Sequence, residues 1–248
     1  MIHEMSVSAL MRSGHHAIIQ WIQGHFDEPL LILNDVPPGT NPFVASRGNP
    51  ATYADRCGNI QSRKGVIYNY EDRDLNLIFS AEFLKLKHLY LGRSKHNYNL
   101  IVIRDPRNCF ASRLEWLDKL ESPTIPHPRN VEGRKMLAER WKQYAKEYLG
   151  ITQIIPNKIP VSYDQWFLDE DYRRQISAKL GLEFNDRHKD KLATQGKSSF
   201  DEFKFLKNAG EMKVLDRWQK FKDDPLYVEL MADKELVGLA ESIFGKIN

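Results

Sequence analysis

The stretch "SALMRSGHHAIIQWI", residues 8–22, joins two segments with different periodicity. Before it, residues 2–9 alternate apolar and polar side chains, which predicts a strand, and residues 16–26 have the apolar spacing of a helix. The turn between them places several backbone N–H groups at a helix N-terminus, where the helix dipole is positive. Such a turn can bind phosphate or sulfate without any special side chain. The stretch therefore predicts an α/β fold with an anion site in its first turn.

Four residues of this first loop bear on the anion. Gly14 permits a close backbone approach, and Arg12 can add charge-assisted hydrogen bonds. His15 and His16 stand where a nucleotide triphosphatase carries Lys and then Ser or Thr, the residues that hold the terminal phosphates and Mg²⁺. A magnesium-dependent triphosphatase is therefore disfavoured. An ordinary turn that binds nothing, with histidines that only start or pack the helix, remains an alternative.

The rest of the chain alternates strand and helix patterns. Further strands are expected at residues 29–35, 65–71, 98–106 and 158–166, and helices at 130–150 and 169–182. The helix at 130–150 carries an apolar stripe that consists of Val131, Met136, Leu137, Trp141, Tyr144 and Leu149, and Gly150 ends it. This order predicts a three-layer α/β fold, with a mostly parallel sheet and helices on both faces. No linker divides the chain, so we expect a single domain over residues 1–248.

Composition narrows the class of protein. The 248 residues are 42% hydrophobic and 28% charged, as in a soluble globular protein. The net charge is +3 without basic runs, which disfavours a dedicated nucleic-acid binder. No apolar stretch is long enough to span a bilayer, and the N-terminus lacks the pattern of a signal peptide. Only Cys57 and Cys109 are present, too few for a disulfide framework, so we expect a reduced, cytoplasmic protein.

A second polar anchor lies in "IVIRDPRNCFASRLEW", residues 101–116. Arg104 follows a buried strand, at the end where open α/β sheets bind ligands. The Asp-Pro after it suits the N-cap and first position of a helix, which places Ser112 about two turns in. A guanidinium and a hydroxyl so placed can close on one phosphate. The alternative is a capped helix with surface arginines, and this is what we expect of Arg107 and Arg113.

The two motifs together, "RSGHH" and "RDPRNCFAS", resemble the signatures of sulfotransferases that use 3′-phosphoadenosine 5′-phosphosulfate (PAPS). The resemblance implies a fold related to P-loop kinases, with no metal and with adenosine 3′,5′-bisphosphate as the product left from the donor. It implies that the first loop binds the 5′-phosphosulfate through Arg12, Ser13, Gly14, His15 and His16. It also implies that Arg104 and Ser112 hold the 3′-phosphate.

The resemblance extends to residues 159–184, where it places Tyr163 near the adenine. The sequence departs from the family in the first loop, because two histidines replace the two threonines of many relatives. The family's C-terminal phosphate-binding segment has no clear counterpart. Residues 207–218 are the expected substitute, with Arg217, Lys207 or Lys213 as donors.

The resemblance implies transfer of a sulfuryl group to a hydroxyl, or an amine, of a small-molecule or carbohydrate acceptor, with no nucleic-acid or membrane partner. Residues 37–64 and 194–212 are expected to be lid or substrate loops. Their aromatic residues, which either line the acceptor cleft or pack onto the core, are Phe43, Tyr53, Phe200, Phe203 and Phe205. The competing functions are a P-loop small-molecule kinase and a non-enzymatic anion or nucleic-acid binder.

The general base is a choice among three residues. Many relatives use a His after the third strand and others a Glu; here that strand ends in Glu71, followed by Asp72. Partial burial beside two tyrosines would raise the pKa of Glu71, so we expect it to be the base and Asp72 to cap the turn before Arg73. Glu71 could instead be a solvated carboxylate paired with Arg73. His15 and His16 are the reserve bases.

Overall fold

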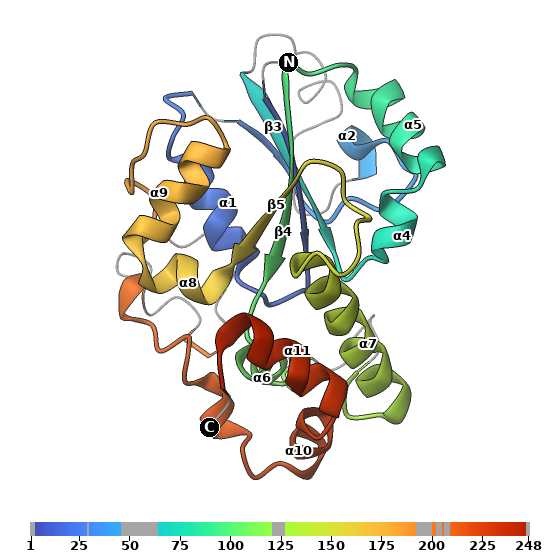
Figure 1. Ribbon diagram of the computed structural model, residues 1–248, viewed down its shortest axis with the longest axis vertical. Helices are drawn as coiled ribbons and strands as arrows, with labels where there is room; N and C mark the ends of the chain where they lie inside the picture. The colour runs from blue at the N-terminus through green and yellow to red at the C-terminus, as the bar shows by residue number, and fades with distance from the viewer. Residues whose placement is uncertain are drawn as a thin grey trace.

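The computed structural model describes residues 3–28, 30–45, 64–120, 127–191, 200–201, 205 and 209–246. Its centre is a parallel sheet of five strands in the order β2-β3-β1-β4-β5 (Figure 1). The strands are β1 (His3–Ala9), β2 (Leu31–Leu33), β3 (Gly65–Glu71), β4 (His96–Ile103) and β5 (Lys158–Ser162). The chain extends the sheet from β1 to one side and then crosses to β4 on the other. Ligands bind outside the carboxyl ends of the strands at such a switch point.

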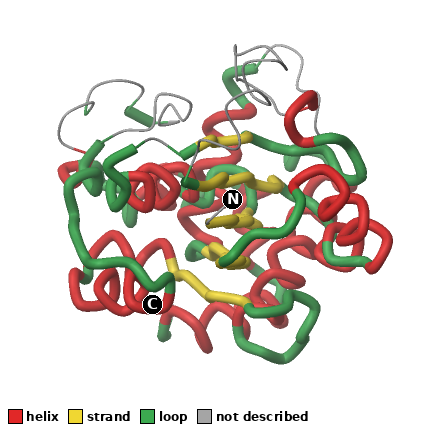
Figure 2. The backbone as a smooth tube through the Cα atoms, turned by 90° about the horizontal axis from the view of Figure 1, so that it is seen from above, coloured by secondary structure: helices red, strands yellow, loops and turns green. Residues whose placement is uncertain are grey.

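Helices cover both faces of the sheet, as Figure 2 shows from above. One face carries α1 (His15–Gln23), α8 (Tyr163–Leu168) and α9 (Glu170–Lys179). The other carries α4 (Leu75–Ile78), α5 (Ala81–Leu91) and α7 (Val131–Tyr148). Beyond the carboxyl ends lie α6 (Pro106–Leu117), α10 (Pro225–Met231) and α11 (Lys234–Phe244) (Figure 1). The remaining short helices are α2 (Pro42–Ala45), η1 (Ala209–Glu211) and η2 (Arg217–Lys220).

The alternation in β1 reflects two buried faces of different chemistry. Met5, Val7 and Ala9 pack in the core under α1, whereas the polar residues that alternate with them are buried on the opposite face. These polar residues are Glu4, Ser6 and Ser8. There Glu4 accepts hydrogen bonds from Tyr68 Oη and Ser94 Oγ, each at 2.9 Å, and Lys87 Nζ lies 3.2 Å away. These partners compensate the desolvation of the carboxylate, which alone would be costly.

An expected strand and an expected apolar stripe differ from the structure, whereas an expected helix end agrees with it. The strand expected over residues 158–166 ends at Ser162, because the Ser162 hydroxyl caps α8 by accepting the Gln165 N–H at 3.3 Å. In α7 the expected apolar stripe is narrower, since Val131 is 71% exposed and Met136 is also exposed. Gly150 follows the end of α7 with a φ of 77°, as expected of a C′ glycine.

The two expected substrate loops fall largely outside the described residues, at 46–63 and at 192–199, 202–204 and 206–208. Cys57, Tyr53, Phe203 and Lys207 fall outside them as well, and Cys109 is buried. Among the helices that are described, none is both long enough and apolar enough to cross a membrane.

Candidate active site

The first loop runs from the end of β1 to the start of α1 and contains two left-handed residues. Gly14, the N-cap of α1, has a φ of 85°, and Arg12 has a φ of 71°. The ring of Tyr163 packs on Gly14 so closely that an added Cβ would lie 2.2 Å from Tyr163 Cε2. Having no side chain, Gly14 cannot cap the helix, so the first N–H groups of α1 receive no bond from an N-cap side chain. The loop thus leaves the start of α1 without an N-cap side chain, the arrangement from which the sequence predicts an anion site.

The second anchor meets the first loop directly. Arg104 follows β4, and its Nη1 donates to the backbone oxygen of Arg12 at 3.1 Å and to Ser112 Oγ at 3.2 Å. Arg217 Nη1 donates to the same Ser112 Oγ at 3.2 Å. The Arg104 guanidinium also lies 5.0 Å from the centre of the Tyr163 ring. The structure therefore brings together Arg104 and Ser112, which the resemblance assigns to the 3′-phosphate, and Tyr163, which it places near the adenine. Arg217 joins them from the segment expected to replace the family's C-terminal motif.

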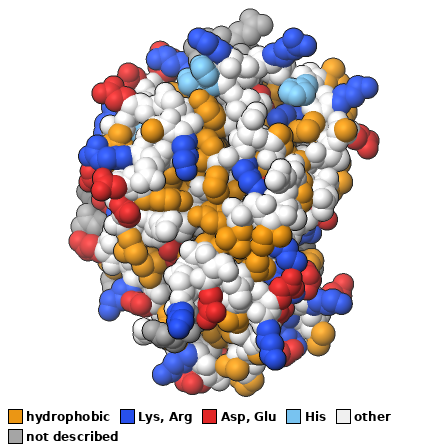
Figure 3. Space-filling model, in the orientation of Figure 1, with side chains coloured by type: hydrophobic (Ala, Val, Ile, Leu, Met, Phe, Trp, Pro, Cys, Tyr) orange, Lys and Arg blue, Asp and Glu red, His pale blue; other side chains and the backbone are white. Residues whose placement is uncertain are grey.

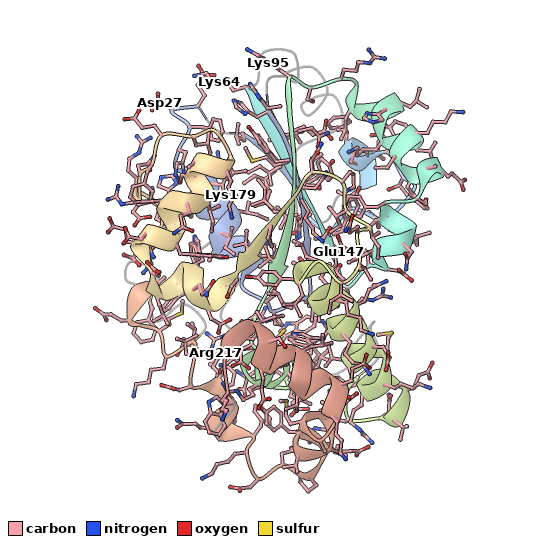
Figure 4. The ribbon with its side chains drawn as sticks, in the orientation of Figure 1. Asp27, Lys64, Lys95, Glu147, Lys179 and Arg217 are labelled. Atoms are coloured by element: carbon pink, nitrogen blue, oxygen red, sulfur yellow. The ribbon has the colours of Figure 1, made fainter. Side chains whose placement is uncertain are left out.

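This end of the site is strongly cationic. Burial and the charge of Arg104 lower the pKa of both Arg12 and Arg217 to about 10. Asp201 Oδ2 lies 3.3 Å from Arg217, and the Arg104 Nε is buried with no hydrogen-bond partner among the described residues. Buried cations held so close together favour an anion that adds negative charge and hydrogen-bond acceptors. Figure 4 shows Arg217 at the carboxyl end of the sheet, beside the helices that close it.

The other two arginines of residues 101–116 have different fates. Arg107 pairs with Asp105, with Nη2 2.7 Å from Oδ2, and is partly exposed. Asp105 also accepts the Arg107 N–H at 2.8 Å, which confirms it as the N-cap of α6. The prediction that Arg113 lies at the surface is wrong. Its side chain is 2% exposed, and Nη1 lies 2.6 Å from Asp72 Oδ2.

A cluster of two histidines and one carboxylate lies at the end of β3. His15 Nε2 and His16 Nε2 lie 3.1 and 3.2 Å from the same Oε1 of Glu71. Asn69 Nδ2 donates to this oxygen at 3.1 Å, and Ser13 Oγ lies 3.3 Å from His15 Nδ1. Sequence reasoning missed Asn69. The feature that could have predicted its place in the cluster is the two-residue spacing from Glu71, which puts both side chains on one face of β3.

The structure contradicts both the alternative role of Glu71 and the pKa expected for it. Glu71 is not solvated and does not pair with Arg73, whose Nη2 bonds Asp35 at 3.0 Å instead; the Glu71 side chain is 8% exposed. Its pKa is not raised either. Burial raises the pKa of Glu71, but the hydrogen bonds from His15 and His16 lower it further, so the net pKa lies well below the usual value. Glu71 is therefore a carboxylate at neutral pH and a weak base.

His16 is the member of the cluster that solvent reaches, with a side chain 23% exposed against 2% for His15. Burial and the neighbouring His15 lower the pKa of His16, while Glu71 raises it. The donor atoms of His15, His16 and Glu71 all lie within 4.8 Å of one another, a set that suits zinc. The positive charge of Arg12 acts on both His16 and Glu71 and opposes a cation there.

Two of the aromatic residues expected in an acceptor cleft that the structure describes pack in different hydrophobic clusters. Phe43 is buried in the core beside β2 and β3, and Phe200 packs edge-to-face on Phe221 with its ring 5.1 Å from the Arg217 guanidinium. A hollow with about 310 Å³ of empty volume lies between the segment after β2, the face of β3 and α5. Its lining includes Tyr68 and Tyr70.

Asp72 does not cap the turn before Arg73. It has a φ of 55°, and its Oδ1 accepts the N–H of Met11 at 3.0 Å. With Arg113 on its other oxygen, Asp72 lies between the first loop and α6. Both contacts join residues far apart in the sequence, so no local sequence pattern predicts them.

Comparison with known proteins gives matches in structure only. No protein-family model matches the chain, and no curated protein sequence matches it. The sulfotransferase domain of the Synechococcus PCC 7002 olefin synthase has a TM-score of 0.56 at 11% identity, over 99% of this chain and 96% of that one. Mouse sulfotransferase SULT7A1, solved in complex with PAP, has a TM-score of 0.53 at 11% identity, over 97% and 89%. The sulfotransferase domain from the curacin biosynthetic pathway has a TM-score of 0.51 at 12% identity, over 100% and 99%. The expected fold is thus confirmed: this chain has the α/β fold of sulfotransferase domains.

Proposed function

We propose that this protein is a sulfotransferase that moves the sulfuryl group of PAPS to a hydroxyl, or an amine, of a small-molecule or carbohydrate acceptor. The observation that carries the proposal is the convergence of Arg104 and Arg217 on Ser112 Oγ, beside an uncapped helix N-terminus. Two anion sites so close together suit a donor with a phosphate at one end and a phosphosulfate at the other. The presence of PAP in the mouse structure of the same fold supports this donor.

In this proposal Arg104, Arg217 and Ser112 bind the 3′-phosphate, and the first N–H groups of α1 bind the 5′-phosphosulfate together with Ser13 and Gly14. Tyr163 stands between the two, against Gly14 and the Arg104 guanidinium, and bounds the nucleotide site. Arg12 stabilises the negative charge that develops on the leaving phosphate as the sulfuryl group departs. None of these roles requires a metal ion.

The geometry favours His16 as the general base, in place of the Glu71 that the sequence predicts. When His16 Nε2–H donates to the Glu71 carboxylate, the other ring nitrogen keeps its lone pair and can accept the proton of the acceptor. Glu71 then orients the imidazole and stabilises its protonated form, as a carboxylate does in other carboxylate–histidine pairs. His15 is buried, and its Nε2 lies against the same Glu71 oxygen, Oε1.

The competing functions find less support. A kinase would need a lysine and a magnesium-holding hydroxyl where the loop has His15 and His16. On the face shown in Figure 3, acidic and basic side chains are interspersed, and a polynucleotide binder would instead carry a basic stripe.

Calorimetry on the purified protein tests the donor. We expect adenosine 3′,5′-bisphosphate to bind in the presence of EDTA, and adenosine 5′-monophosphate, which lacks the 3′-phosphate, to bind at least about tenfold more weakly. Labelled PAPS with a panel of hydroxyl and amine acceptors then tests turnover. Binding of ATP–Mg²⁺ in preference to the bisphosphate would overturn the proposal in favour of a kinase.

A further inference from the structure

One ion pair touches all three segments of the candidate site. Asp72 directly follows Glu71 at the end of β3, and Arg113 directly follows Ser112 in α6. Asp72 Oδ2 lies 2.6 Å from Arg113 Nη1, and Asp72 Oδ1 accepts the N–H of Met11, the residue before Arg12 in the first loop. The pair therefore adjoins the histidine–carboxylate cluster, the 3′-phosphate site and the phosphosulfate loop.

The pair is held more firmly than a surface salt bridge. The Arg113 side chain is 2% exposed and Asp72 18%, so neither charge is well solvated and each depends on the other. The Asp72 backbone N–H also donates to the carbonyl of Ala9 at 3.0 Å. Side chain and backbone of Asp72 thus both fasten β3 to the segment that leaves β1.

The backbone at this point is strained. Asp72 and Arg12 are non-glycine residues with left-handed φ values of 55° and 71°. Such conformations are unfavourable for residues with a side chain and persist only where the surroundings fix them. The Asp72 carboxylate supplies that constraint, because it binds the N–H immediately before Arg12.

We propose that the Asp72–Arg113 pair is the positioning device of the site: it holds the first loop, the Glu71 carboxylate and the Ser112 helix in one arrangement. This inference rests on the proposed function. Without the pair, Glu71 is no longer fixed relative to His15 and His16, and Arg12 is no longer fixed relative to Arg104. Neither Asp72 nor Arg113 touches the reacting groups in this scheme, so both are positioning residues.

The variants Asp72→Asn, Arg113→Met and Arg113→Lys test this role, together with the double variant Asp72→Asn/Arg113→Met. We expect kcat to fall by between about tenfold and about 100-fold in the first two, the scale of a misplaced catalytic group. KM for PAPS should change by less than kcat does. Arg113→Lys keeps the charge and should recover most of the loss, and the double variant should be no slower than the slower single variant.

Arg173→Met is the matched control. Arg173 also forms a buried ion pair, with Nη2 2.9 Å from Asp186 Oδ2, but it lies in α9, which packs on the face of the sheet that α1 and α8 cover. The Arg173→Met variant should lower the melting temperature as Arg113→Met does, and it should leave kcat unchanged. If Arg113→Met lowers only the melting temperature, with kcat within about twofold of the unmodified protein, the pair is structural and the inference fails.

The titration of His16, followed by NMR of the histidine rings without any substrate, separates this inference from the proposed function. The charged groups that act on His16 are His15, Glu71 and Arg12. Because the Asp72–Arg113 pair fixes Glu71 and Arg12, Arg113→Met should shift the His16 pKa, and Arg173→Met should not. An unshifted His16 overturns the inference even in an active enzyme. An unmodified protein that binds no bisphosphate overturns the proposed function, whatever His16 does.

Discussion

Three arginines within residues 101–116 show that the role of a residue is set by its partner. Arg104 donates to neutral oxygens, the Ser112 hydroxyl that it shares with Arg217 and the backbone carbonyl of Arg12. Arg107 and Arg113 each have a carboxylate within 2.7 Å. A guanidinium whose charge is already matched does not attract an anion, so Arg104 is the residue of the three that suits a ligand.

Arg104→Ala should therefore weaken binding of adenosine 3′,5′-bisphosphate by about 1.5–3 kcal/mol, the range for a hydrogen bond to a charged group. Ser112→Ala should cost less, because it removes a neutral hydroxyl. Arg107→Ala, from the same segment, is the control and should bind the bisphosphate normally. Calorimetry measures all three, and equal affinity of Arg104→Ala and the unmodified protein would rule out this phosphate site.

The pH dependence of kcat identifies the base. Burial and His15 lower the pKa of His16 below its usual 6.5, so kcat should fall with decreasing pH along a limb whose midpoint lies below that value. His16→Asn should remove this limb and lower kcat by about 10²-fold or more. Glu71→Gln removes a group that raises the pKa of His16, so the limb should move to lower pH. If His16→Asn keeps kcat and Glu71→Gln abolishes it, Glu71 is the base, as the sequence predicts.

At the scale of elements, the start of α1 depends on a helix distant in sequence. Gly14 combines a left-handed φ with contact against Tyr163, the first residue of α8. Alanine would be strained by the φ alone and would also collide with the ring. The loop, α1 and α8 thus form one packed unit.

Gly14→Ala should consequently destabilise the protein by about 2–4 kcal/mol, from a positive φ and from overpacking together. Combining it with Tyr163→Leu should cost less than the sum of the two single changes, because the smaller side chain removes the collision. Denaturant unfolding measures each free energy. Additive losses would show that backbone strain accounts for the whole effect of Gly14→Ala.

How much of these elements the sequence predicts depends on how far apart in the chain the interacting residues lie. The presence and order of the strands, the N-cap at Asp105 and the terminal Gly150 depend on near neighbours, and the structure has them as expected, although the strand expected over residues 158–166 ends at Ser162. The burial of Arg113 and the bond from Met11 to Asp72 depend on residues that meet only in the folded chain. A charged side chain in a helix is usually solvated, so the sequence alone predicts that Arg113 lies at the surface.

At the scale of the whole molecule, the parallel sheet accumulates positive charge at one edge. Arg104 follows β4, Arg12 follows β1, and Arg217 arrives from the C-terminal region. The positions of Arg104 and Arg12 follow from topology, because parallel strands present their carboxyl ends together. An acidic residue of α8, Asp164, lies at the same edge and accepts the N–H of Asp105 at 3.0 Å.

Asp164 makes the stability of the protein depend on pH. Burial raises its pKa from 3.8 to about 6, although the charge of Arg104 opposes the shift. A raised pKa means that the folded state binds the proton more tightly than the unfolded state does. This contribution is complete below the unfolded pKa near 3.8 and is lost as the pH rises through about 6.

Asp164→Asn, which keeps an oxygen for the Asp105 N–H, should remove this dependence. The melting temperature of the unmodified protein, relative to that of Asp164→Asn, should therefore fall between about pH 4 and pH 7. The comparison cancels the other titrating groups, such as His16, because both proteins contain them. Added adenosine 3′,5′-bisphosphate brings negative charge towards Asp164, so it should raise the pKa of Asp164 further and move the fall to higher pH. A difference in melting temperature that stays constant with pH would show that Asp164 is ionised in the folded protein throughout this range.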